Sequence, residues 1–375
     1  MPVTEAARRI HQGSLSPVDL VEECLACIRE RDPGLEAWVY VDEAGARAIA
    51  RERAAEATAG KLRGPLHGIP VGVKDIFHVA GMPTTAGAAA FAHETPTEDA
   101  TAVERLRAAG AVIIGKTATT EFAYMDPAPT RNPWNREHTP GGSSSGSAAA
   151  VAARMVPLAL GTQTVGSVLR PAAYCGVVGV KPTHGLVPAA GVIPLAWSLD
   201  HVGCFARSVR DAALALGVLA DRAFRVSLAP PTVGLPTAWV DRASAEVAAH
   251  VRLVAGRLAK GGARVEEMAL PPAMERLEEA GRTVLRVEAA TYHTDRFGGD
   301  LSRHRIGLAE LVRSGLAVAG VDYVRANRAR LACRAAMAPL LARHQVLLTP
   351  VAPAPAPKGL ASTGDPSFCA PWSFI

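Results

Sequence analysis

Short apolar runs alternate with amphipathic stretches along most of the chain. Residues 69–77 (IPVGVKDIF) are apolar at consecutive positions, a pattern typical of a strand buried on both faces. Ser16 followed by Pro17 is a strong helix start, because serine caps the first turn and proline fits the first helical position. This helix should end near Arg31, where an Asp-Pro-Gly turn follows.

The same alternation continues to the end of the chain. Helices are predicted at residues 43–58, 97–109, 208–219 and 243–260, and mostly helical structure at 273–341. Strands are predicted at residues 111–114, 176–181, 232–240, 263–270 and 346–349. The helix at 208–219 should begin with a capping box of Ser208 and Asp211. Strands that alternate with helices predict an α/β layer architecture.

The stretch from Thr139 to Pro182 contains two Gly/Ser loops, GGSSSGS and GTQTVGS. Apolar segments at 148–160 and 172–180 separate and follow these loops, and both are apolar enough to be buried. A flexible linker has no reason to carry such segments. Gly/Ser loops between buried elements bring backbone close to a ligand or to another chain segment.

Composition adds limits rather than a function. The 375 residues are 49% hydrophobic and 20% charged, which is a soluble globular balance. The net charge of +5 comes without a Lys/Arg block, so nucleic-acid binding is not indicated. The first residues lack the apolar core of a signal peptide, no apolar run reaches transmembrane length, and the six cysteines predict free thiols in a reducing cytoplasm. Cys24 and Cys27 lie in a helical pattern and are predicted to pack in the core.

Lys74 lies inside the apolar strand pattern, where a lysine is rarely buried without a reason. Burial would lower the pKa of its ammonium group and make it a possible general base. The alternative is a lysine at a strand end that reaches water or pairs with Asp75. The residues alone do not choose between these readings.

The serines of the two Gly/Ser loops are the candidate nucleophiles, and their alternative role is turn formation. Residues 142–146 (GSSSG) match the G-x-S-x-G nucleophile elbow centred on Ser144, but loop sequence precedes them where that motif needs a strand. No histidine stands in a recognisable Ser-His-Asp order, and lysine can replace histidine as the base. Phosphate, metal and dinucleotide motifs are absent from the sequence, so no metal or cofactor is predicted.

Taken in order, several segments resemble the amidase signature family: GPLHGIPVGVKDIF, DATAVERLRAAGAVIIGKT, TPGGSSSGSAAA, GTQTVGS, PAAYCGVVGVKPT and SLDHVG. The resemblance covers nearly the whole chain. It implies a mixed, mainly parallel β-sheet covered on both sides by helices. It also implies an amide hydrolase that uses a Ser-(cis-Ser)-Lys triad and no cofactor.

The family pattern carries over residue by residue. It implies that Lys74 is the base, that Ser143 is the bridging serine, and that Ser167, 24 positions further on, is the nucleophile. The implied oxyanion hole consists of the backbone N–H groups of Thr164, Val165, Gly166 and Ser167. Supporting roles near the triad are implied for Ser145 and Gln163.

Three positions in and just after the second Gly/Ser loop depart from the usual family sequence. Gln163 replaces an aspartate and keeps hydrogen bonding without the charge. Val165 replaces a glycine, and a positive φ there would be costly. Leu169 replaces an arginine, with Arg170 one position later. Since Lys74 and both serines are present, these departures are interpreted as subgroup variation.

Three regions are expected: an N-terminal helical region at 1–60, the signature core at 61–220 and a remaining α/β part at 221–375. The last part ends earlier than family members usually do, which predicts an exposed apolar end at Trp372 and Phe374. The leading prediction is a cytoplasmic amidase acting on a small-molecule amide, without membrane or nucleic-acid partners, and a homodimer is one option for its assembly. The alternatives are the glutaminase-type component of a tRNA-dependent amidotransferase, which would meet tRNA within its complex, and a non-catalytic relative.

Overall fold

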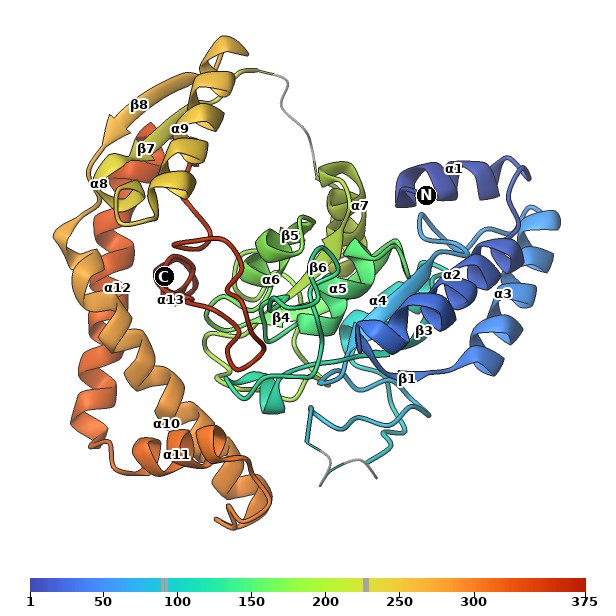
Figure 1. Cartoon of the computed structure of the whole chain (residues 1–375), viewed down its shortest axis with the longest axis horizontal. Helices are drawn as coiled ribbons and strands as arrows, with labels where there is room; N and C mark the ends of the chain where they lie inside the picture. Colours follow the sequence, from blue (N-terminus) through green and yellow to red (C-terminus); the bar gives the residue numbers. More distant parts are fainter. Residues whose placement is uncertain (89–90, 92–93, 225–228) are drawn as a thin grey trace.

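The computed structural model describes residues 1–375 except 89–90, 92–93 and 225–228. Its centre is a six-stranded sheet in the order β1-β3-β2-β4-β6-β5 (Figure 1). The strands are β1 Trp38–Val41, β2 Pro70–Lys74, β3 Val112–Thr117, β4 Leu158–Gln163, β5 Val178–Val180 and β6 His201–Ala206. The central strand β2 is parallel to both neighbours, β3 and β4, while β1, β5 and β6 pair antiparallel. The predicted mixed sheet is confirmed.

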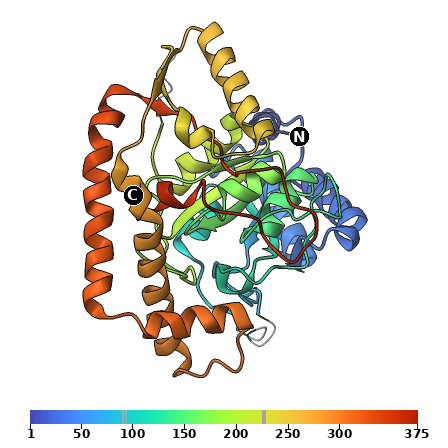
Figure 2. The same ribbon diagram turned by 60° about the vertical axis from the view of Figure 1, so that its left-hand side comes forward.

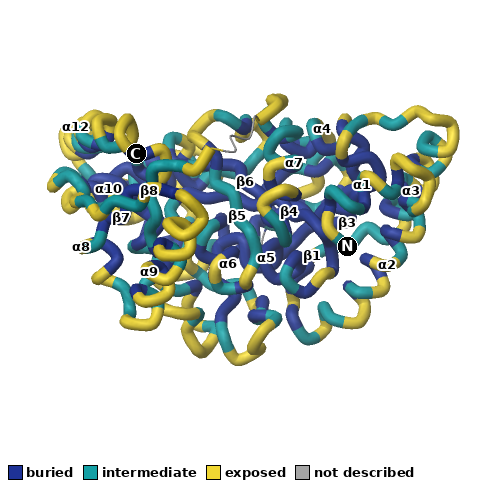
Figure 3. The backbone as a smooth tube through the Cα atoms, turned by 90° about the horizontal axis from the view of Figure 1, so that it is seen from above, coloured by how far each residue is buried: buried dark blue, intermediate teal, exposed yellow. Residues whose placement is uncertain are grey.

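Helices cover both faces of this sheet. They are α1 Val3–His11, α2 Pro17–Arg31, α3 Glu43–Thr58, α4 Thr101–Ala108, α5 Ser145–Ala152, α6 Leu169–Tyr174 and α7 Val209–Leu219. Strand residues alternate between two cores, so Ile113 packs with α1, α4 and α7, whereas Val112 and Ile114 pack with α2, α3, α5 and α6. In Figure 3 the buried residues concentrate along the sheet, and the outer helices carry most of the exposed ones.

A smaller parallel sheet, in the order β8-β7-β9, lies beyond this core. Its strands are β7 Thr232–Pro236, β8 Arg264–Met268 and β9 Val346–Leu347, and its helices are α8 Thr237–Val240 and α9 Ala245–Lys260. The long helices α10 Leu277–Phe297 and α12 Gly320–Arg343 run side by side, with α11 Ile306–Leu316 at one end (Figure 2). Short 3-10 helices occupy Asp32–Gly34, Glu121–Ala123 and Pro272–Arg276.

Local signals fixed several element boundaries correctly. Ser16 accepts a hydrogen bond from the Val18 N–H, and Ser208 caps α7 through the Asp211 N–H at 3.1 Å. Other boundaries were wrong. The strand predicted at 232–240 ends at Pro236, because proline has no N–H for the ladder, and α8 follows. The helix predicted at 97–109 begins only at Thr101.

The C-terminal segment returns to the core and ends in the short helix α13 Ala370–Phe374. Phe374 is 1% exposed and packs on α10, where the absence of a side chain at Gly281 makes room for its ring. Trp372 lies edge-to-face with Trp239, their ring centroids 6.3 Å apart. The prediction of an exposed apolar end was therefore wrong: Phe374 is buried, and Trp372 is partly buried against the core.

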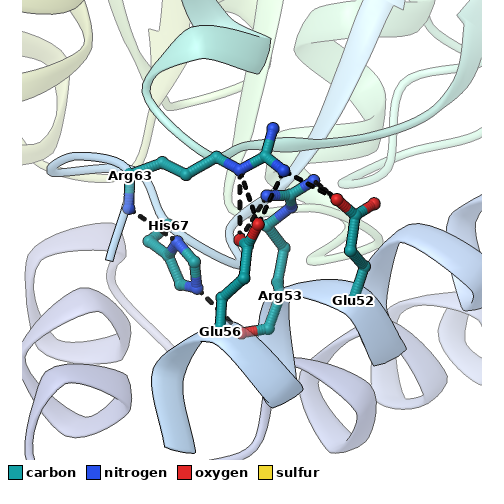
Figure 4. A network of polar contacts seen from close by, with 5 residues as sticks. All are labelled: Glu52, Arg53, Glu56, Arg63 and His67. Carbon is teal, nitrogen blue, oxygen red and sulfur yellow. Dashed lines mark hydrogen bonds and ion pairs between the residues drawn. The ribbon is translucent and has the colours of Figure 1, made fainter. Parts of the chain in front are cut away.

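A polar network attaches α3 to the loop that leads into β2 (Figure 4). Arg53 is 4% exposed and forms ion pairs with Glu52 and Glu56, which also receive the guanidinium of Arg63. The His67 ring closes the network between the Arg63 N–H and the carbonyl of Arg53. His67, the last residue of this network, lies in the loop before β2, seven residues before Lys74.

Candidate active site

Three neighbouring strands, β2, β4 and β6, bring polar side chains together at the same end of the large sheet. Lys74 is the last residue of β2, and Thr162 lies at the corresponding end of the parallel neighbour β4. Strand β6 runs antiparallel to β4, with His201 opposite Gln163. Asp200, the residue before β6, therefore lies at the same end of the sheet as Thr162. Residues 74, 162 and 200 are far apart in sequence and meet because of this strand order.

Lys74 is completely buried. Its Nζ donates to Ser143 Oγ at 2.7 Å and to Thr162 Oγ1 at 2.8 Å. It therefore neither reaches water nor pairs with Asp75, the two alternatives left open by the sequence. Burial lowers the pKa of Lys74 from 10.5 to about 7, and the charge of Asp200 opposes that shift. An amine in this range is available in its neutral form near neutral pH.

Asp75 has a different partner, which sequence reasoning missed. Its carboxylate lies 2.8 Å from the ammonium of Lys116 on β3, and both side chains are fully buried. The Lys116 ammonium also donates to Pro83 O at 2.9 Å and to Thr84 Oγ1 at 2.8 Å. The available signal was a lysine inside the apolar strand VIIGKT, the same anomaly that marked Lys74.

The three consecutive serines of the first Gly/Ser loop, at positions 143–145, lie in three different situations. Ser143 follows a cis peptide bond from Gly142 and faces Lys74. Ser144 is fully buried and its hydroxyl lies between the carbonyl and the N–H of Thr162, at 3.2 and 3.3 Å. Ser145 begins α5 and donates to Gly141 O at 2.7 Å. Only the Ser143 hydroxyl is directed at the lysine, because the others are bound to backbone.

The second loop places Ser167 beside the first. The Ser144 N–H donates to Ser167 O at 3.3 Å, which joins the two loops. The Ser167 side chain is 8% exposed and its hydroxyl has no hydrogen-bond partner within the described residues. The amide N–H groups of 164–167 likewise have no acceptor in the part of the chain that the structure describes. A free hydroxyl thus lies next to a row of unpaired donors.

Gln163 shapes the second loop from both ends of its amide. Its Oε1 accepts from the Val168 and Leu169 N–H groups, each at 2.9 Å. Its Nε2 donates to Ser373 Oγ at 3.0 Å, and that hydroxyl donates in turn to Val165 O at 2.9 Å. Val165 has no positive φ, so the strain expected from a branched residue at this position does not arise.

Arg170 stabilises the first loop through hydrogen bonds. Its buried guanidinium donates to Gly142 O at 2.8 Å, to Thr363 Oγ1 at 3.0 Å and to Gly364 O at 2.9 Å. The shift of arginine from position 169 to 170 therefore still supplies a guanidinium to the peptide before Ser143. Its contacts also tie the C-terminal segment to this loop.

Asp200 accepts three hydrogen bonds in a partly buried position. Burial raises the pKa of this carboxyl group to about 6, against the opposing effects of its hydrogen bonds and of Lys74. A small pocket at the site is lined by Thr162, Thr164 and Asp200 and by apolar side chains from Ile76, Ala123, Val192 and Ile193. Among the described residues, no group of three or more His, Cys, Asp or Glu side chains is placed to hold a metal ion.

A buried amine bonded to one serine, with a second free serine and unpaired amides beside it, defines a site suited to acyl transfer. The family model described as Amidase matches residues 19–368, and the chain belongs to this family. An amidase of Pseudomonas putida is 38% identical over 95% of this chain and 80% of its own length. A solved structure described as a crystal structure of amidase superposes with a TM-score of 0.92 at 35% identity, covering 100% of this chain and 90% of that one.

A second group of relatives is described differently. The A subunit of the glutamyl-tRNA(Gln) amidotransferase of Roseiflexus castenholzii is 41% identical over 72% of this chain. The matched region spans only 60% of that relative's own length. In the described part of the chain, no helix combines the length and the apolar character needed to cross a membrane.

Proposed function

We propose that the protein is an amidase that hydrolyses a carboxylic amide to an acid and ammonia or an amine through a serine acyl-enzyme. The observation that carries this proposal is the buried Lys74 amine, held between the hydroxyls of Ser143 and Thr162. The relatives support an amide as substrate, because proteins described as amidases match nearly the whole chain.

In the proposed mechanism the lone pair of neutral Lys74 accepts the proton of Ser143, and Ser143 accepts the proton of Ser167. Ser167 Oγ then attacks the amide carbonyl carbon. The negative charge that develops on the carbonyl oxygen is stabilised by the N–H groups of 164–167, each contributing about 3 kcal/mol in comparable sites. The proton returns through Ser143 to the leaving nitrogen, the C–N bond breaks, and water releases the acid from the ester.

The remaining residues hold this arrangement. Ser145 donates to the Gly141 carbonyl within the first loop, and Gln163 orders the second loop from Val165 to Leu169. The substrate is proposed to be a small amide. All six cysteines are unpaired thiols, which supports the expected reducing, cytoplasmic location.

The test compares two serines of the same region. We expect Ser167→Ala to lower kcat on the order of 10⁴-fold or more and to abolish a trapped acyl adduct detected by mass spectrometry. The matched control Ser144→Ala should keep the adduct and much of the activity, losing about 1–2 kcal/mol of stability from its backbone hydrogen bonds. A panel of aryl and aliphatic amides, assayed for ammonia or amine release, supplies the substrate. An adduct on Ser144 would contradict the proposal.

A second candidate function is that of the glutaminase-type component of a tRNA-dependent amidotransferase. The observation that favours it is the 41% identity to such a protein, although that match covers less of this chain than the amidase match does. Ammonia release that requires partner proteins and aminoacyl-tRNA would support this second function. Folded protein in which Ser167 reacts with neither amides nor a fluorophosphonate probe would indicate a non-catalytic relative.

A further inference from the structure

Asp200 is a partly buried carboxylate that the proposed proton transfers do not use. Its Oδ1 accepts from Thr164 Oγ1 at 2.5 Å, and its Oδ2 accepts from the N–H groups of Leu195 and Ala196 at 2.9 and 3.0 Å. Burying a carboxylate costs several kcal/mol unless hydrogen bonds and a nearby positive charge compensate. Three short hydrogen bonds supply one part of that compensation.

The second part of the compensation is the positive charge of Lys74, which favours the ionised form of Asp200. Thr162, which accepts a hydrogen bond from the Lys74 amine, lines the same small pocket as Asp200. Each of the two groups acts on the ionisation of the other. The charge of Asp200 raises the pKa of Lys74 against the effect of burial, whereas Asp75 is paired with Lys116.

The other titratable neighbours do not duplicate this contact. His201 follows Asp200, and burial lowers the pKa of its ring to about 4, so the ring is neutral near pH 7. The charge of Lys181 lowers the pKa of His201 further, and the His184 ring lies edge-to-face with the His201 ring, their centroids 5.2 Å apart. The Asp200–Lys74 interaction therefore stands apart from the histidines.

We propose that Asp200 is a positioning residue with two effects. It anchors Thr164 at the start of the 164–167 loop, and its negative charge acts on the Lys74 amine. This inference rests on the proposed amidase function for its kinetic consequences only. The anchor orients the unpaired N–H donors. The charge stabilises the ammonium that forms when Lys74 takes the proton from Ser143.

The two effects separate in two variants. Thr164→Val removes the anchor and also one of the hydrogen bonds that lower the pKa of Asp200. Its kcat should therefore be compared at high pH, where Asp200 is ionised in both proteins, and should fall about 10-fold there. Asp200→Asn removes the charge, so the acid limb should move to lower pH by on the order of one unit, because the ammonium loses its stabilising partner. A purely structural role would lower activity in both variants without moving the acid limb.

A direct titration makes the test independent of activity. The chain contains six lysines, so ¹³C-labelled lysine gives few signals, and Lys74→Met identifies the one from Lys74. We expect the Lys74 signal to titrate at lower pH in Asp200→Asn than in the parent protein. An unchanged midpoint would overturn the charge effect, and full kcat in Thr164→Val would overturn the anchor.

If Asp200→Asn does not fold, the reciprocal measurement decides the question. In Lys74→Met, the ¹³C-labelled Asp200 carboxyl should retain its proton to a higher pH than in the parent protein, because linkage between two sites is mutual. An unchanged Asp200 midpoint would overturn the proposal. A moved Lys74 midpoint in a protein that hydrolyses no amide would instead leave this inference intact and contradict the proposed function.

Discussion

Lys74→Met should change the pH dependence of stability in a way that no surface lysine can. In the folded protein the pKa of Lys74 is lowered from 10.5 to about 7. Between these values the unfolded chain binds a proton that the folded protein lacks. Stability must then rise with pH across this interval, because the unfolded state binds more protons. Below pH 7 both states are protonated, and the full cost of burying the charge applies.

The magnitude follows from the two pKa values. Their difference, from 10.5 to about 7, corresponds to roughly 5 kcal/mol at about 1.4 kcal/mol per pKa unit. Most of it is recovered in an accessible range, roughly 3 kcal/mol from pH 7 to pH 9.5. Methionine cannot titrate, so this term is absent from the variant. The variant also loses two hydrogen bonds, a penalty of about 1 kcal/mol each that is independent of pH.

The assay is urea unfolding of both proteins at several pH values. The free energy of unfolding of the parent minus that of Lys74→Met should rise by roughly 3 kcal/mol from pH 7 to pH 9.5. Groups that titrate alike in both proteins cancel in this difference. The control is Lys260→Met at the exposed end of α9, for which the difference should be flat. A flat difference for Lys74→Met would refute the neutral-amine reasoning, whatever the activity.

Two further predictions concern packing around the site. Lys116→Met leaves the Asp75 carboxylate buried and unpaired, so urea unfolding should show a loss of about 3–5 kcal/mol, whereas Lys358→Met in an exposed pair should lose less than about 1 kcal/mol; equal losses would contradict the buried pair. Gly281→Ala places a Cβ inside van der Waals contact of the Phe374 ring and should lower the melting temperature, at a cost of about 1–3 kcal/mol. Phe374→Ala should relieve much of that cost in the double variant, and strictly additive losses would argue against the contact.

Local signals predicted those parts of the fold that local chemistry decides. The cap at Ser16 and the capping box at Ser208 gave correct helix starts, because the bonds they make lie within three residues. The sequence pattern did not reveal β1, α1 or β6. Strand β1 has only four residues, too few for a periodic signal. Strand β6 is buried at every position, and a short apolar run of that kind is ambiguous without its neighbours.

The site residues, like the elements of the fold, could be predicted from the sequence only in part. Residue chemistry singled out Lys74 and the loop serines, and the family resemblance implied the pairing of Ser143 with Ser167. The choice between Asp75 and a serine as partner of Lys74 needed the sheet. Adjacent strand residues point to opposite faces, so Lys74 and Asp75 cannot readily pair. Only the placement of β3 beside β2 shows that Lys116 is the residue that reaches Asp75.

This geometry gives a physical reason for the neutral side chain at position 163. A carboxylate there would add a second negative charge at the end of β4, beside the threonine that holds the Lys74 amine. Negative charge stabilises the ammonium and would raise the pKa of Lys74, keeping the base protonated to higher pH. Gln163 instead uses its carbonyl to bind the N–H groups of Val168 and Leu169 and its amide to bind Ser373. Gln163 thus orders the loop through hydrogen bonds without adding a charge to that of Asp200, which already raises the pKa of the amine.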